Sequence, residues 1–162
     1  MLPRHQLWLP RQQVEARMYT ISADATITAD LDAVWTTVTD VEAWPTWDPH
    51  EEQARLDGPF ATGTTGWSKP HGAPAATWTI TEVVPGRRWG STCGLPGGRI
   101  SGVNTFEPAG AGRVRCTKSF SVTGPLVPLF WLHFGRRIRR DMARSFAALE
   151  REANRRTAAA AQ

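Results

Sequence analysis

Apolar and polar residues alternate from position 19 to position 27, with tyrosine, isoleucine and alanine on one face and threonine, serine and aspartate on the other. This pattern predicts a half-buried strand. From residue 30 to residue 39 the apolar spacing becomes helical and Asp30 is a suitable N-cap, so a short helix is expected there. The next stretch, residues 40–49 (DVEAWPTWDP), contains two prolines, which the interior of a helix or a central strand excludes. It is therefore predicted to be a broken turn whose tryptophans either cap a core or line a cavity.

Between residues 50 and 124, short β-type segments are separated by turns rich in glycine and proline. Connections of this kind are typical of antiparallel neighbours. The sequence therefore predicts six further strands in an antiparallel meander, within residues 50–58, 59–70, 76–84, 89–93, 99–108 and 113–124.

From Trp131 onward the apolar residues are three or four positions apart, which predicts a long amphipathic helix. They are Phe134, Ile138, Met142, Phe146, Leu149 and Ala153. Pro125 and Pro128 are expected just before this helix. The whole pattern predicts an α+β fold in which one long helix covers one face of a curved sheet and leaves space between the two.

The chain of 162 residues is long enough for one domain with its own core. Residues 1–16 show no periodic pattern and are expected to form a poorly ordered extension. The domain is expected to span residues 17–155, and the alanine-rich tail at 156–162 is expected to fray. No segment is apolar enough to span a membrane or to serve as a signal peptide.

Composition narrows the candidate functions. The net charge is +4, and six of the 19 basic residues lie between Arg136 and Arg151, a segregation that a uniformly basic nucleic-acid-binding protein would not show. Two cysteines form neither a disulfide framework nor a zinc motif, which indicates a cytoplasmic protein with reduced thiols. Eight tryptophans are many for a small core, and they favour a pocket for an apolar or aromatic ligand.

Four segments carry a resemblance that covers residues 18–152: DLDAVWTTVTDVEAWPTWDP, LDGPFATGTTGWSKPHG, TITEVVPGRRW and FSVTGPLVPLFWLHFGRRI. With their order along the chain, they resemble the polyketide cyclase/dehydrase and lipid-transport group of the START-like (SRPBCC) superfamily. The resemblance implies the helix-grip fold, in which a seven-stranded antiparallel sheet wraps around the C-terminal helix and encloses a cavity. It also implies binding of lipids, hormones or polyketides, with aromatic ring closure in some members. Asn104 stands where many relatives carry histidine, which argues against acid–base chemistry here.

Strand alternation assigns side chains to the cavity. If Phe106 points inward, Asn104 shares its face, and the same reasoning places Lys118 with Phe120 and Ser91 with Trp89. The residues expected to bind the ligand are Trp44, Trp47, Trp67, Trp78, Trp89, Asn104, Phe106, Lys118, Phe120, Phe134 and Ile138.

The catalytic candidates are Lys118, Asn104 and His71, and each has a plainer interpretation. An inward lysine is either an anchor for a carboxylate or phenolate, or a side chain that reaches the rim of the sheet. His71, in the loop KPHGAP, is either a base at the cavity mouth or simply exposed. Asp48, near His50 in sequence, either serves the site or initiates a turn.

Two further features have structural explanations. Cys93 and Cys116 are expected to face inward with the strand at 99–108 between them, and two strand spacings of about 9.5 Å are too wide for a disulfide. The basic helix face, which holds Arg136, Arg137, Arg139, Arg140 and Arg144, is either solvated, with an Arg137–Asp141 pair, or docks on an anionic membrane or nucleic acid.

The leading hypothesis is a cytoplasmic protein that binds a small hydrophobic or aromatic molecule. It is expected to be a monomer or homodimer and to need no metal or cofactor. Neither a nucleic-acid partner nor stable insertion into a membrane is expected. The alternative is a polyketide cyclase or dehydratase that uses the same cavity. A third hypothesis is an interaction module that acts through the basic helix.

Overall fold

The computed structural model describes residues 18–125 and 127–162, apart from the side chains of Phe130, Trp131, His133 and Phe134. The predicted extension at residues 1–16 lies outside the described residues. The strands are β1 (Met18–Thr28), β2 (Glu51–Leu56), β3 (Thr65–Pro70), β4 (Ala76–Val84), β5 (Arg88–Leu95), β6 (Gly98–Pro108) and β7 (Arg113–Thr123). The helices are α1 (Leu31–Thr39), the 3₁₀ turn η1 (Val41–Ala43), α2 (Trp44–Trp47) and α3 (Val127–Ala160).

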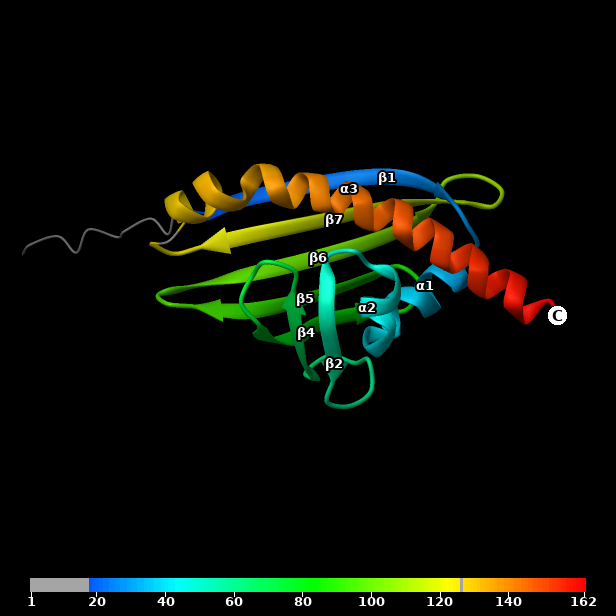
Figure 1. The fold of residues 1–162 in the computed structure, drawn as a ribbon, viewed down its shortest axis with the longest axis horizontal. Helices are drawn as coiled ribbons and strands as arrows, with labels where there is room; N and C mark the ends of the chain where they lie inside the picture. Colours follow the sequence, from blue (N-terminus) through cyan, green and yellow to red (C-terminus); the bar gives the residue numbers. More distant parts are fainter. Residues whose placement is uncertain (1–17, 126) are drawn as a thin grey trace, which may run out of the picture.

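All seven strands form one antiparallel sheet in the order β1-β7-β6-β5-β4-β3-β2. The long helix α3 lies along the sheet beside β1 and β7, α1 lies beside the C-terminal part of α3, and α2 lies beside β2 (Figure 1). This confirms the predicted α+β helix-grip architecture, with a sheet curved around the C-terminal helix.

Local sequence explains the first elements. In β1 the burial alternates as predicted, and Ile21 and Ile27 are fully buried. The Asp30 carboxylate caps α1 by accepting hydrogen bonds from the backbone N–H groups of Asp32 and Ala33. The cap satisfies two donors that the first turn of the helix leaves without partners, and it fixes where α1 begins.

The C-terminal helix begins earlier than expected. It starts at Val127, so Pro128 lies inside its first turn rather than before it. Proline is tolerated there because first-turn N–H groups have no partner within the helix. The helix also continues to Ala160, past the boundary expected at residue 155. In the described part of the chain, no helix has the length and apolar character needed to cross a membrane.

The register of β5, β6 and β7 places inward-facing residues in rows across the sheet. Trp89 pairs with Asn104, and Asn104 pairs with Lys118, so these three side chains lie next to one another. Cys93 and Cys116 lie on β5 and β7 with β6 between them, and both are free, which confirms that they form no disulfide.

Candidate functional site

A cavity of about 650 Å³ lies between the inner face of the sheet and α3, with α2 on one side. Nine of the eleven residues expected to bind a ligand line it: Trp44, Trp47, Trp78, Trp89, Asn104, Phe106, Lys118, Phe120 and Ile138. The tenth, Phe134, has a side chain outside the described residues. The eleventh, Trp67, lies elsewhere.

Trp67 does not line the cavity, contrary to expectation. Its neighbours Gly66 and Ser68 are the buried residues of β3, and Trp67 is on the opposite face, where the Arg55 guanidinium lies 5.1 Å from the centre of its ring. Trp67 was expected in the cavity together with the other tryptophans of the sheet. Side chains alternate between the two faces of a strand, and this alternation was not applied to β3. Gly66 is the inward residue, and its missing side chain leaves room for the Trp78 ring.

Three tryptophans form one wall of the cavity. The Trp44 and Trp78 rings stack with centres 5.7 Å apart, and the Trp89 ring lies 6.0 Å from Trp44 and 6.4 Å from Trp78. The indole N–H of Trp44 donates to the backbone carbonyl of Val38 at 3.1 Å, which fixes α2 against α1. The broken turn containing Pro45 therefore holds tryptophans against the sheet, where they line the cavity.

The cavity is also lined by ionisable groups, among them Glu51 and Lys118. Burial raises the pKa of the Glu51 carboxyl to about 7, although the charge of Lys118 acts to lower it and that of Asp48 to raise it further. The half-buried Lys118 lies with its Nζ 5.4 Å from the centre of the Phe120 ring. A carboxyl group with a pKa near neutrality can both donate and accept a proton at physiological pH.

Glu51 was missed at the level of sequence because of a β-bulge. Ala54 and Leu56 are the more buried residues of β2, and strict alternation from them would turn Glu52 inward and Glu51 outward. The register between β2 and β3 shifts between Glu51 and Gln53, however. The extra residue reverses the alternation, so Glu51 lines the cavity while Glu52 pairs with Lys69 at 2.6 Å.

Asp48 ties α3 to the segment before β2. It is buried, and its Oδ1 accepts hydrogen bonds from the Ser145 hydroxyl and from the backbone N–H of His50, both at 2.9 Å. The second bond is the turn that the sequence suggested as one interpretation of Asp48. The first joins two segments 97 positions apart in sequence, so Asp48 also positions His50 beside the helix.

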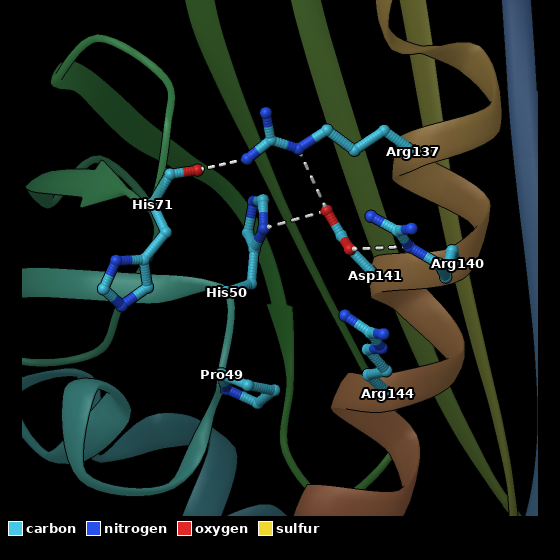
Figure 2. Close-up of a pocket in the computed structure, with 7 residues that line it drawn as sticks. All are labelled: Pro49, His50, His71, Arg137, Arg140, Asp141 and Arg144. Atoms are coloured by element: carbon cyan, nitrogen blue, oxygen red, sulfur yellow. Dashed lines mark hydrogen bonds and ion pairs between the residues drawn. The ribbon is translucent and has the colours of Figure 1, made fainter.

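A smaller pocket of about 270 Å³ adjoins the cavity, and we call it the mouth pocket. It is lined by Pro49, His50, His71, Arg137, Arg140, Asp141 and Arg144. Its residues His50, Arg137 and Asp141 also line the main cavity. Figure 2 shows that the three arginines and Asp141 come from α3, whereas Pro49, His50 and His71 come from the opposite wall.

Ion pairs organise the mouth pocket. The Asp141 carboxylate lies 3.5 Å from Arg137 Nε, as the sequence predicted for this pair, and 3.6 Å from His50 Nδ1. Arg137 also donates to the backbone carbonyl of His71, which joins α3 to the loop before β4. Burial lowers the pKa of the His50 imidazole, and the positive charge of Lys118 lowers it further, whereas the carboxylates of Asp48 and Asp141 act to raise it.

The three catalytic candidates occupy different places. Lys118 and Asn104 line the main cavity on adjacent strands. His71 lines only the mouth pocket, with an exposed imidazole 4.0 Å from Glu52. The described residues contain no cluster of three or more side chains suited to hold a metal ion.

Three buried polar side-chain atoms have no hydrogen-bond partner within the described part of the chain. They are Trp47 Nε1, Trp89 Nε1 and Glu51 Oε2. All three residues line the cavity. Buried polar groups are nearly always hydrogen-bonded in folded proteins, so the wall of the cavity contains two N–H donors and one carboxyl oxygen whose hydrogen-bonding capacity the described residues leave unused.

Three solved structures share this fold. The Zhui aromatase/cyclase from Streptomyces sp. R1128 has a TM-score of 0.69 and 18% identity, covering 87% of this chain and 96% of its own. Norcoclaurine synthase from Thalictrum flavum, in complex with dopamine and hydroxybenzaldehyde, has a TM-score of 0.67 and 14% identity, covering 93% of each chain. A START superfamily protein from Mycobacterium smegmatis has a TM-score of 0.64 and 13% identity, and the match covers 84% of this chain and 97% of that protein's chain.

No curated protein matches the chain by sequence. The model of one family, described as polyketide cyclase / dehydrase and lipid transport, matches residues 18–154. That match spans the sheet, the wall of tryptophans and most of α3. The chain therefore belongs to the polyketide cyclase/dehydrase and lipid transport family.

Proposed function

We propose that the protein binds a small hydrophobic or aromatic molecule in the cavity between the sheet and α3. The observation that carries this proposal is the cavity itself. Its volume of about 650 Å³ lies within the usual range for small-molecule sites. Its wall of tryptophans offers flat apolar surfaces on which a ring can stack.

The polar atoms of the cavity favour a ligand that also carries oxygen. The indole N–H groups of Trp47 and Trp89 are donors without a described partner, and Glu51 Oε2 lacks one as well. A phenol or a carbonyl compound suits a cavity wall that contains such side chains, because its oxygen accepts from N–H and a hydroxyl donates to a carboxylate. The aromatic compounds bound to norcoclaurine synthase, dopamine and hydroxybenzaldehyde, have this chemistry and support the proposal.

Titration with the fluorescent probe N-phenyl-1-naphthylamine tests the binding. The probe should bind one site per chain, and it should raise the melting temperature as its concentration increases, because only the folded state has the cavity. Gly102 lines the cavity, and an added Cβ would lie 3.0 Å from the Phe120 ring. Gly102→Val should therefore weaken binding by about ten-fold or more, which corresponds to about 1.4 kcal/mol.

The control is Val103→Leu, at the next position of β6 on the outer face, where Val103 is 38% exposed. This change should leave the affinity for the probe as it is. Absence of probe binding to the wild type, or equal loss in both variants, would contradict the proposal.

The second candidate function is acid–base catalysis in the same cavity. The observation that favours it is the position of Glu51 in the cavity lining. Its pKa of about 7 suits a general base near neutral pH. Its carboxylate would take a proton from a carbon next to a ligand carbonyl, and the Lys118 ammonium would stabilise the enolate oxygen. Such a step is the first half of the ring closure by which a cyclase forms a carbon–carbon bond.

Deuterium exchange into the ketone 2-tetralone, followed by NMR, tests this candidate. The wild type should accelerate exchange at the carbons beside the carbonyl, and Glu51→Gln should abolish the acceleration. Glu52→Gln, one position along and outside the cavity, should retain it. If the wild type exchanges no faster than buffer, or if the Glu51 variant remains active, Glu51 is not the base.

A further inference from the structure

The arginines of α3 divide into two groups. Arg137, Arg140 and Arg144 line the mouth pocket, whereas Arg136 and Arg139 do not. All five are exposed except Arg137, which is half-buried. Residues three and four positions apart share a helix face, so the three pocket arginines form one stripe on α3. Figure 2 shows the Arg140 and Arg144 side chains extending from the helix toward the segment that holds Pro49 and His50.

The stripe carries more positive charge than its surroundings neutralise. Three guanidinium groups share the mouth pocket with one carboxylate, that of Asp141. Arg137 lies 3.5 Å from that carboxylate and also holds the loop carbonyl of His71. Arg140 is 3.9 Å from it, and Arg144 forms no ion pair with any described residue. Like charges one turn apart repel each other, so a bound anion would relieve that repulsion.

The mouth pocket adjoins the apolar cavity, because His50, Arg137 and Asp141 line both. We propose that Arg140 and Arg144, assisted by Arg137, bind the acidic group of the ligand, while its apolar part lies in the main cavity. The ligand class is an amphiphile with a carboxylate, phosphate or sulfonate at one end. Guanidinium groups suit such anions, because their N–H donors match the oxygens of these groups in geometry and charge. This inference rests on the proposed binding function. It adds that the ligand has an acidic group at one end and an apolar part at the other.

Two probes that differ only in an acidic group test the inference. N-phenyl-1-naphthylamine is neutral, and 8-anilinonaphthalene-1-sulfonate is the same molecule with a sulfonate. Fluorescence titration should show that the wild type binds the sulfonate about ten-fold more tightly or better. The double variant Arg140→Gln/Arg144→Gln should lose this preference and keep its affinity for the neutral probe.

The matched control is Arg136→Gln/Arg139→Gln, which removes the same charge from the same helix outside the pocket. It should keep the preference for the sulfonate. A wild type without preference, a preference that survives in the Arg140/Arg144 variant, or an equal loss in the control would each overturn the inference. Binding of the neutral probe would still stand in those cases, so the proposed function would survive. Failure of both probes to bind would overturn both proposals.

Inorganic sulfate distinguishes an acidic head group from a free anion. Sulfate at the concentration of the probe, with ionic strength matched by sodium chloride, should leave the sulfonate probe bound, because the free ion has no apolar part for the cavity. Displacement of the probe at that concentration would show that a free anion is the occupant, and the assignment to a ligand head group would be wrong.

Discussion

Replacing Glu51 with glutamine should reduce the loss of stability that the protein undergoes as pH rises from 5 to 8. The pKa of Glu51 is about 7 in the folded protein, against an ordinary value of 4.5, because burial disfavours its ionised form. Between these values the folded state binds more protons than the unfolded state. The free energy of unfolding contributed by this group therefore falls as pH rises from about 4.5 to about 7.

The magnitude follows from the same two values. Each pKa unit corresponds to about 1.4 kcal/mol, so the ionised carboxylate costs the folded state about 3.4 kcal/mol well above pH 7. About 2.5 kcal/mol of this cost develops between pH 5 and pH 8. Glu51 is half-buried and lines the cavity, and solvent screens part of the energy, so we expect a measured difference of about 1 to 2 kcal/mol.

Urea unfolding followed by tryptophan fluorescence at pH 5 and pH 8 measures this difference. Between pH 5 and pH 8, the free energy of unfolding of the wild type should fall by about 1 to 2 kcal/mol more than that of Glu51→Gln. The control is Glu52→Gln, because a hydrogen bond from Lys69 lowers the pKa of Glu52, so that this group is ionised at both pH values. Its variant should follow the wild type in pH dependence. If Glu51→Gln also follows the wild type, the carboxyl does not titrate near pH 7 and the reasoning fails.

Three smaller changes test other parts of the structure by the same unfolding measurement. Asp30→Ala removes the cap of α1 and should cost about 1 kcal/mol; an unchanged stability would mean that the cap contributes nothing. Ser145→Ala removes a hydrogen bond to the buried Asp48 and should cost about 1 to 3 kcal/mol, whereas a neutral result would show that water replaces the hydroxyl. Gly66→Ala places a Cβ 2.3 Å from the nearest atom of the Trp78 ring and should cost about 1 to 3 kcal/mol with a shift in tryptophan emission; full stability would mean that the ring moves freely.

Much of the architecture could be predicted because the sequence patterns are long and regular. The alternation in β1 extends over several residue pairs, and the helical spacing in α3 extends over several turns. One residue that departs from such a pattern therefore does not change the predicted type of element. The same regularity predicted that Asn104 and Lys118 face the cavity, because β6 and β7 pair without a register shift. Their neighbour Trp89 follows from the register between β5 and β6.

The rest depends on irregularities that periodicity does not reveal. The bulge in β2 exchanges the faces of Glu51 and Glu52, and nothing in the letters EEQARL announces it. Trp67 was placed in the cavity because large aromatic residues favour burial, but the strand face decides where a side chain points. The mouth pocket depends on the position of α3 relative to the loop that contains His71, which is a tertiary contact.

The two parts of the proposed site are joined by one helix. Ile138 and Met142 face the apolar cavity, and each directly follows a residue of the mouth pocket, Arg137 and Asp141. Consecutive residues of an α-helix differ by about 100° in direction, so the apolar stripe and the basic stripe of α3 are adjacent. The basic stripe extends from Arg137 to Arg144, about 10 Å along the helix axis. Because a rigid helix fixes the distance between the stripes, the protein should distinguish amphiphiles by the separation of their acidic and apolar groups as well as by their chemistry.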